Sequence, residues 1–225
     1  MNKVQMYLTL VISITPGSSF KNFLLRQLGH DIHPTAKFGP NLVIGKTKIL
    51  LREGSRVRPF NILRNIRLEL GSNSIIGSWN WFSAAPALAT LSTYKPVFQL
   101  GSSTAINSRN YFDCSGGITF GSFADLAGVR STFVTHYIDT KLNEQTCKPI
   151  VIGDRTMLSS NLIAMPGATV GAKSIVAAGT VLIGRTYPGE SLIAGNPGQL
   201  KSPKSGAWFE RNQGPVLPID KSESP

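Results

Sequence analysis

Histidine is the residue type in this sequence best suited to proton transfer, and the chain has three: His30, His33 and His136. An imidazole titrates near neutral pH and can therefore act as a general base. His30 and His33 precede the first clear repeat of the chain, and we expect them to be structural or exposed. His136 lies in the segment 133–150, which interrupts that repeat. Taken alone, this position is more typical of a histidine on a surface loop.

Few other residues are placed along the sequence so that they could react together with His136. Asp139, three residues further on, could orient the imidazole or simply face solvent. The two cysteines, Cys114 and Cys147, have neither CxxC nor metal-ligand spacing and are typical of buried, reduced thiols in a cytosolic protein. A zinc site would need three histidines at fixed positions of the repeat. Of the three, only His136 lies in the core of the predicted β-helix region, so we expect no metal.

A six-residue period indicates which elements position these residues. Hydrophobic residues recur at this interval at Ile152, Leu158, Ala164, Val170, Val176 and Leu182. A second, mostly small series accompanies them at Thr156, Leu162, Ala168, Ser174 and Thr180. Three hexads make one triangular turn of about 18 residues, and stacked turns pair as parallel strands about 4.8 Å apart. The sequence therefore predicts an all-β fold, a left-handed parallel β-helix with a hydrophobic axis.

The same step appears in pieces nearer the N-terminus. These pieces are Ile32, Phe38 and Ile44; Leu70, Ile76, Phe82 and Leu88; and Leu100, Ile106 and Phe112. Gaps separate the pieces and the phase slips between the first two, so loops or irregular coils must interrupt them. A β-sandwich would show a period of two, and an α/β fold would need helical patterns between its strands. We therefore assign residues 30–203 to one β-helix domain.

The first 29 residues form a separate N-terminal segment. Val4–Ile14 is mostly apolar but shorter than the roughly 20 residues that span a bilayer, and a poor cleavage site follows it for a signal peptide. Helical spacing is then found at Phe20, Phe23, Leu24 and Leu28. We expect this segment to cap the core, with contact to a membrane surface as the alternative. The predicted location is cytoplasmic, peripheral on the inner face of the membrane in the alternative.

Charge is unevenly distributed along the chain, whose formal net charge is +11. Residues 1–70 contain eleven Lys and Arg against three Asp and Glu, a net charge of +8. Such a basic surface can face anionic lipid, a phosphorylated substrate or nucleic acid. No nucleic-acid-binding motif accompanies it, so we expect no nucleic-acid partner. The tail, 204–225, is predicted to be irregular, with Trp208 and Phe209 folding back onto the prism.

Five short motifs follow one another in a fixed order in the C-terminal half. They are Thr135–Asp139, Lys148–Asp154, Pro166–Gly171, Ala177–Val181 and Ala194–Pro197. In order and spacing, the sequence from about Leu100 to Lys201 resembles the hexapeptide-repeat acetyltransferases, specifically the maltose/galactoside and polysaccharide O-acetyltransferase group. The resemblance covers about half of the chain. It implies a homotrimer, with coenzyme A in a groove between neighbouring subunits.

The resemblance also assigns roles around the interruption of the repeat. His136 matches the general base, which removes the proton of an acceptor hydroxyl so that the acceptor attacks the thioester directly. Glu144 corresponds, across a loop of different length, to an acid near the base. Asn107 or Asn110, about thirty residues before the histidine, would hold the acceptor. Either asparagine is also typical of an ordinary corner, because asparagine tolerates left-handed backbone.

Two small residues match the donor-binding positions of these enzymes. The backbone N–H of Ser160 would steady the oxyanion, and Ala178, one turn later, would meet the pantetheine arm. Both residues are equally typical of any tight coil. Met157 replaces a tryptophan often found before the oxyanion residue, which puts acceptor stacking there in doubt.

The phosphate-binding residues of the group fall on Gln199 and Ser202, which are uncharged. Lys201 and Lys204 lie nearby and could take their place, or could simply be solvated. The resemblance thus implies an acetyl-CoA-dependent O-acetyltransferase acting on a sugar or glycan, lipid-linked or free, in cell-surface polysaccharide biosynthesis. N-acetylation of an amino sugar and a non-catalytic β-helix scaffold are the alternatives.

Overall fold

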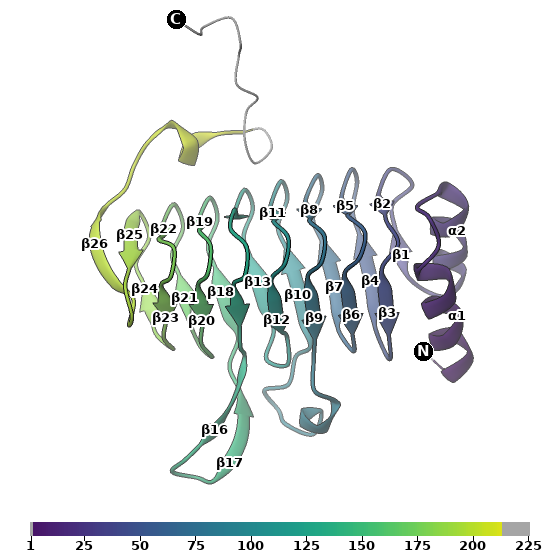
Figure 1. The fold of residues 1–225 in the computed structure, drawn as a ribbon, viewed down its shortest axis with the longest axis horizontal. Helices are drawn as coiled ribbons and strands as arrows, with labels where there is room; N and C mark the ends of the chain where they lie inside the picture. Colours follow the sequence, from purple (N-terminus) through teal and green to yellow (C-terminus); the bar gives the residue numbers. More distant parts are fainter. Residues whose placement is uncertain (1, 213–225) are drawn as a thin grey trace, which may run out of the picture.

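The structure is a computed structural model that describes residues 2–212. Figure 1 shows a long three-sided prism of stacked strands with two helices at its N-terminal end and a hairpin projecting from one side. The predicted tail beyond residue 212 lies outside the described residues. Three long sheets form the sides of the prism, and each turn of the chain adds one strand to each sheet.

The three sheets are named here in the order in which the chain enters them. The first sheet contains β1 (Asp31–Ile32), β4 (Lys48–Leu51), β7 (Arg67–Leu70), β10 (Val97–Leu100), β13 (Ile118–Phe120), β18 (Ile150–Ile152), β21 (Thr169–Val170) and β24 (Thr186–Tyr187). The second contains β2 (Lys37–Phe38), β5 (Arg56–Val57), β8 (Ile75–Ile76), β11 (Ala105–Ile106), β14 (Asp125–Leu126), β19 (Met157–Leu158), β22 (Ile175–Val176), β25 (Ser191–Ala194) and the antiparallel β26 (Gln199–Pro203). The third contains β3 (Leu42–Ile44), β6 (Ile62–Arg64), β9 (Trp81–Ser83), β12 (Tyr111–Asp113), β15 (Thr132–Phe133), β20 (Ile163–Ala164) and β23 (Val181–Leu182).

The six-residue period lies along the axis of this prism, as predicted. Every residue of the series from Ile152 to Leu182 is at most 1% exposed, and so is every member of the accompanying small series. Aromatic side chains fill the middle of the axis, where the ring of Phe112 stacks on those of Phe82 and Phe133 at 4.7 and 4.9 Å between centroids. Burial of this column in successive turns is what stabilises the fold, because each turn covers its apolar face only with its neighbours.

Two positions of the early repeat were predicted wrongly. In β3, the side chain of Val43 rather than that of Ile44 points into the core of the prism. The corner between β2 and β3 is one residue shorter than a regular hexad, since Phe38 and Val43 are five residues apart. Leu88 is buried, but it lies in the short 3-10 helix η1 (Pro86–Leu88), within a loop that leaves the prism after β9.

A ladder of buried asparagines lines the corner at which the chain enters the third sheet. Its rungs are Asn41, Asn61, Asn80 and Asn110, each at most 3% exposed. The Oδ1 of each rung accepts a hydrogen bond from the backbone N–H of the residue one turn later, at 2.8–2.9 Å. The Ser131 N–H is the donor to the last rung. The ladder therefore satisfies backbone donors that the tight corner leaves without a strand partner.

The two helices α1 (Lys3–Ser13) and α2 (Ser19–Gln27) close the N-terminal end of the prism (Figure 1). His30 joins α1 to the first turn, because its Nε2 contacts the Thr9 hydroxyl at 3.1 Å and its Nδ1 accepts from the Ile49 N–H at 3.2 Å. Burial, reinforced by the charge of Lys48, lowers the pKa of His30 to about 4. His30 is therefore a neutral, structural histidine.

Lys21 holds the same cap from α2. Its buried Nζ donates to the carbonyl oxygens of Ser13, Thr15 and Gly39 at 2.7–2.8 Å. Burial lowers the pKa of this amine to about 8. One side chain thus satisfies the end of α1, the connection between the helices and the first turn together.

After β26 the chain turns back along the second sheet. Phe209, in η2 (Ala207–Glu210), is buried, and the guanidinium of Arg211 pairs with Asp125 at 3.1 Å. Arg211 also lies over the ring of Trp208, at 3.7 Å from its centroid. The predicted return of Trp208 and Phe209 onto the prism is therefore confirmed.

Candidate active site

Two excursions leave the prism where strands of the third sheet end. One is the hairpin of β16 (His136–Asp139) and β17 (Glu144–Cys147), which occupies the predicted interruption 133–150. The other is the loop 84–96, which falls at the expected interruption before Leu100 but begins before Leu88, a residue that the sequence assigned to the repeat. Ser115 holds both ends of this loop, since its Oγ accepts from the Ala85 N–H at 3.1 Å and its carbonyl from the Lys95 N–H at 2.9 Å.

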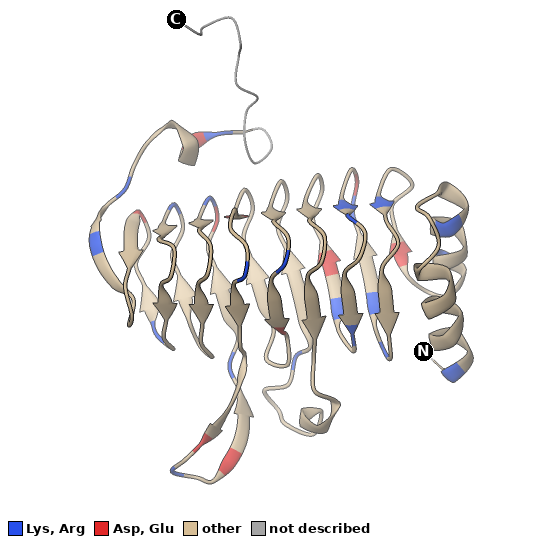
Figure 2. Cartoon of the chain, viewed as in Figure 1, with Lys and Arg blue, Asp and Glu red and all other residues tan. Residues whose placement is uncertain are grey.

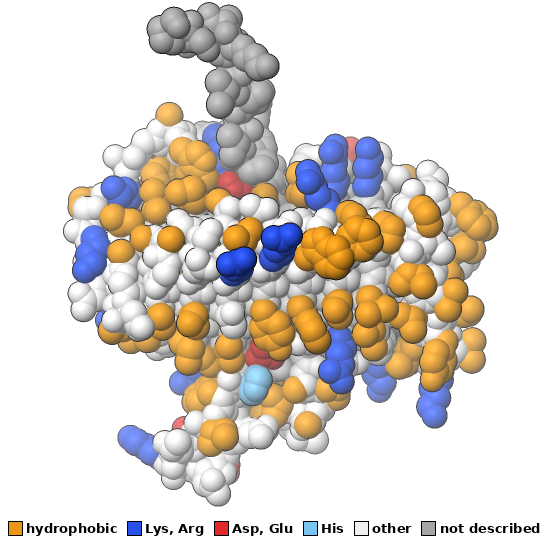
Figure 3. All heavy atoms as spheres, viewed as in Figure 1, with side chains coloured by type: hydrophobic (Ala, Val, Ile, Leu, Met, Phe, Trp, Pro, Cys, Tyr) orange, Lys and Arg blue, Asp and Glu red, His pale blue; other side chains and the backbone are white. Residues whose placement is uncertain are grey.

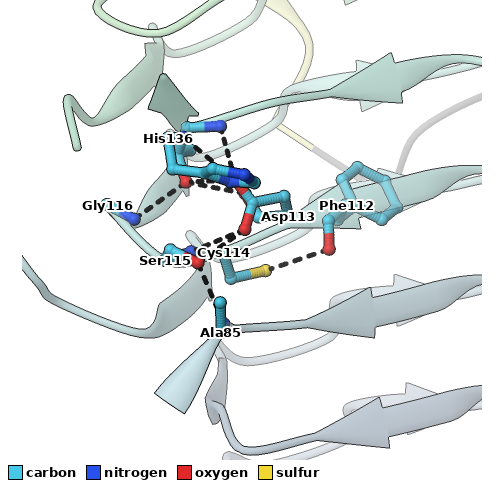
Figure 4. A network of polar contacts seen from close by, with 8 residues as sticks. Ala85, Phe112, Asp113, Cys114, Ser115, Gly116 and His136 are labelled. Carbon is cyan, nitrogen blue, oxygen red and sulfur yellow. Dashed lines mark hydrogen bonds and ion pairs between the residues drawn. The ribbon is translucent and has the colours of Figure 1, made fainter. Parts of the chain in front are cut away.

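His136, the first residue of the hairpin, is held by a carboxylate from the preceding turn. Its Nδ1 lies 2.7 Å from Oδ2 of Asp113, and its backbone N–H donates to the same oxygen at 3.0 Å (Figure 4). Asp113 is nearly buried, with 6% of its side chain exposed, whereas 44% of the His136 side chain is exposed. The imidazole is thus fixed from inside and open to a ligand outside.

The carboxyl group of Asp113 is ionised at neutral pH. Burial alone would raise its pKa, but hydrogen bonds from Ser115, from His136 and from the Thr135 backbone outweigh that effect and hold the pKa below its ordinary value. An ionised carboxylate can only accept, so Nδ1 of His136 carries the hydrogen. This tautomer leaves Nε2 free to take a proton, which is the arrangement of a histidine base oriented by a carboxylate.

The sequence missed Asp113 because it lies 23 residues before the histidine. The repeat itself contains the signal. Phe112 and Phe133 are register partners in successive turns, so the residues that directly follow them are also neighbours. The position of Asp113 at the end of β12 therefore brings it beneath the start of the hairpin.

The other predicted acids do not reach the imidazole. Asp139 pairs with Glu144 across the hairpin, and its Oδ1 accepts the N–H groups of Lys141 and Leu142 at 3.0 and 3.2 Å, which closes the turn. Side chains alternate along a strand, so Asp139 and Glu144 lie on the face of the hairpin opposite to His136. Asp113, rather than Asp139, orients the histidine.

Neither cysteine is available as a nucleophile. Cys114 and Cys147 are buried free thiols beside Asp113. Burial and the nearby carboxylate raise the pKa of both thiols, so they stay protonated near neutral pH. Among residues 2–212 no group of three or more His, Cys, Asp or Glu side chains is placed to hold a metal ion.

The predicted donor and acceptor residues lie at a different corner, where the chain passes from the second to the third sheet. The strand register aligns Ser160 with Ala178 one turn later and with Gly128 one turn earlier. A Cβ on Gly128 would lie 2.2 Å from the Ser160 nitrogen, so only glycine allows this approach. The Ser160 N–H donates to no atom of the described chain. The row of Gly128, Ser160 and Ala178 is called here the small-residue corner. Its surface is narrow, and the Ser160 N–H is its free backbone donor.

The two predicted asparagines lie at this same corner, but they differ in exposure. Asn107 is exposed and lines a hollow of about 380 Å³ on the second sheet, together with Ser108, Asp125 and Arg58. Asn110 is a rung of the buried ladder, and its amide is committed to neighbouring turns. Only Asn107 can therefore touch an acceptor.

The structure also places the remaining predicted residues. Lys201 lies exposed on β26 and Lys204 follows that strand, partly exposed. Met157 begins β19, next to the small-residue corner.

Comparisons with known proteins give a curated relative and a set of solved structures. No family model matches the sequence. A putative acetyltransferase of Bacillus subtilis, YvoF, is 29% identical over 72 residues, which are 32% of this chain and 40% of that protein's length.

Solved structures share the fold. The polySia-specific acetyltransferase NeuO superposes with a TM-score of 0.53 at 14% identity, over 87% of this chain and 84% of its own. A hexapeptide-repeat acetyltransferase of Vibrio cholerae, solved in complex with acetyl coenzyme A, gives a TM-score of 0.41 at 19% identity, over 91% and 87%. The three parallel sheets and the superposition on NeuO show that the chain folds as a left-handed parallel β-helix.

Proposed function

We propose that the protein is an acyltransferase that moves an acetyl group from acetyl-CoA to a hydroxyl of a sugar or glycan, with His136 as general base. The observation that carries the proposal is the 2.7 Å contact between Nδ1 of His136 and the buried carboxylate of Asp113. It lies at the interruption of a fold that NeuO, a sugar-polymer acetyltransferase by name, shares. The sequence resemblance supports the same class.

The chemistry assigned to the chain's own residues is proton transfer and positioning. Nε2 of His136 takes the proton of the acceptor hydroxyl as its oxygen attacks, and returns that proton to the departing sulfur. Asp113 stabilises the imidazolium that forms between these two events. Acetyl-CoA, as co-substrate, supplies the thioester carbonyl. No residue of the enzyme needs to be acylated, which agrees with the protonated state of both cysteines.

The small-residue corner fits the donor. A slim row formed by Gly128, Ser160 and Ala178 suits a thin pantetheine chain, and the free Ser160 N–H can stabilise negative charge on a carbonyl oxygen. Lys201 and Lys204 are the cations assigned to the phosphates at the end of that chain.

The base and the donor corner lie on opposite edges of the third sheet within one chain. Asn107 and the small-residue corner precede its strands, whereas Asp113 and the hairpin follow them. These groups can act together only if the hairpin of one copy faces the corner of another. The proposed active unit is therefore an oligomer, a homotrimer by the sequence resemblance, with the site between subunits.

The acceptor is assigned to the sugar and glycan class, and the protein to cell-surface polysaccharide biosynthesis in the cytoplasm. Asn107 and Ser108 at the hollow of the second sheet offer the amide and hydroxyl partners that sugar hydroxyls bind. No observation on the described residues favours an amine over a hydroxyl, so O-acetylation follows from the resemblance.

The test uses acetyl-CoA with a panel of neutral, acidic and amino sugars, and measures free thiol and the acetylated product. His136→Ala should lower kcat by about 10²–10⁴-fold, the typical share of a general base. Calorimetric affinity for coenzyme A should stay within a factor of about two, because the donor corner is unchanged. His33→Ala, a second partly exposed histidine, is the matched control.

An amide product would replace the O-acetyl assignment by N-acetylation. If the protein binds no coenzyme A, or if His136→Ala keeps full turnover, the proposed activity is wrong.

A further inference from the structure

Helix α1 is amphipathic, but it buries its polar face and exposes its apolar face. Its polar residues Thr9 and Ser13 are buried against the prism, where Thr9 contacts His30 and the Ser13 hydroxyl lies 3.3 Å from the Val43 N–H. Its opposite face is apolar and open to solvent. An isolated water-soluble domain normally turns the apolar face of a surface helix inward.

The open apolar surface continues onto α2, and the whole of it is called the apolar cap here. Its members are Val4, Tyr7, Leu8, Val11, Ile14, Phe20 and Phe23, each 45–69% exposed. Their exposed area is about 700 Å², taking about 150–220 Å² for a fully exposed large side chain, and the largest patch on a typical monomer is about 300–600 Å². Figure 3 shows hydrophobic side chains gathered over this end of the molecule.

Cations border the apolar cap on two sides. A hollow of about 750 Å³ at the start of α2 is lined by Lys37, Arg56 and Arg58, and a hollow of about 290 Å³ beside α1 is lined by Lys46 and Lys48. No Asp or Glu lines either hollow, and neither helix carries an acidic residue (Figure 2).

Two of these cations are placed at a direct electrostatic cost. Lys37 and Arg56 are register partners on adjacent strands, β2 and β5, with both side chains outward. Like charges opposite each other in a sheet are destabilising. An anionic ligand would relieve this repulsion, and phosphate groups suit both side chains.

We infer that the apolar cap docks onto an anionic phospholipid bilayer, with its apolar side chains inserted between lipids and the two basic hollows on the headgroup phosphates. Neither helix of the described chain is long and apolar enough to pass through a bilayer, so the contact lies in the interface. A second copy is the poorer occupant, because two caps face to face would bring the same cations together. This inference stands apart from the proposed activity.

The experiment is vesicle sedimentation of the full chain. Vesicles of phosphatidylcholine alone are compared with vesicles containing about one third phosphatidylglycerol, at low and high salt. Binding to the anionic vesicles should be tighter by about tenfold or more, and this preference should shrink in high salt. The double variant Tyr7→Glu/Phe20→Glu should lose binding to both, and Lys37→Glu/Arg56→Glu should lose the preference for anionic vesicles.

Leu200→Glu is the matched control, since Leu200 is 52% exposed on β26 at the other end of the prism. It should bind as the unaltered protein does. All variants change exposed side chains and should keep the far-ultraviolet circular dichroism and unfolding midpoint of the parent. Acetyl transfer to a soluble acceptor should persist in Tyr7→Glu/Phe20→Glu, which separates this inference from the proposed function.

Absence of binding to anionic vesicles would overturn the inference, and so would unchanged binding of the Tyr7→Glu/Phe20→Glu variant. Self-association that depends on Tyr7 and Phe20 and occurs without vesicle binding would assign the cap to a second copy instead.

Discussion

The two edges of the third sheet have the same strands and opposite characters. At the edge where the chain enters the sheet, the buried ladder of Asn41, Asn61, Asn80 and Asn110 and the small-residue corner keep successive turns in close register. At the edge where the chain leaves it, the loop 84–96 and the β16–β17 hairpin depart from the prism. One edge is fixed by repetition, and the other is free to vary.

This difference shows how a repeat can carry a specific site. The ladder and the small corner leave little space for new side chains, so they present backbone groups and a slim surface. The hairpin adds the imidazole of His136, which we propose as the base, on a support that the repeat has already fixed through Asp113. Because one chain keeps these features on separate edges, the comparison predicts that catalysis needs two copies.

Subunit mixing is the strongest way to break that prediction. His136→Ala removes the base, and Ala178→Trp fills the donor corner at an exposed position, so each variant alone should have almost no activity. If the two edges act across an interface, mixed oligomers regain intact sites formed by the hairpin of one variant and the corner of the other. Random mixing in equal amounts should restore about one quarter of all sites, and about one third of the sites in the trimers that contain both variants.

The measurement is the initial rate of CoA release by oligomers that carry two different tags and are purified through both. Mixtures that stay as inactive as their parents would show that base and donor corner belong to the same chain.

Exchanging the carboxylate at the variable edge tests which acid serves the base. Asp113→Asn should lower kcat by about 100-fold or more, because the amide no longer fixes the tautomer or stabilises the imidazolium. Asp139→Asn, on the other face of the hairpin, should leave kcat nearly unchanged. The readout is kcat against KM for the two variants, and equal losses would contradict the assignment of Asp113.

Asp113 should also give the hairpin a pH-dependent stability. The folded pKa is held below the ordinary carboxyl value, so the stabilisation is present above that ordinary value and is lost as pH falls through the folded pKa. Urea unfolding at neutral and acidic pH should therefore show a smaller acid loss for Asp113→Asn than for the parent protein.

The same contrast explains what the sequence could predict. The series from Ile152 to Leu182 follows from burial at a fixed period, and it located the interruption that contains His136. Contacts across an excursion have no fixed period, so the sequence offered Asp139, three residues from the histidine, and missed Asp113. Leu88 fitted a hexad by spacing alone. The sequence did not separate Asn107 from Asn110. Whether an asparagine at this corner is exposed or belongs to the buried ladder depends on a difference of a few residues along the chain.

The fixed edge is tested by removing one rung of its ladder. Asn80→Ala takes away the oxygen that accepts the Asn110 N–H at 2.9 Å, and also the amide that lies 3.1 Å from Oδ1 of Asn61. A buried donor left without a partner costs about 1–3 kcal/mol, so the free energy of unfolding should fall by about 2 kcal/mol in urea titrations. The kcat of the folded fraction should stay unchanged, because neither His136 nor the small-residue corner contacts this rung. A loss of turnover without a loss of stability would mean that the edge we describe as structural takes part in the chemistry.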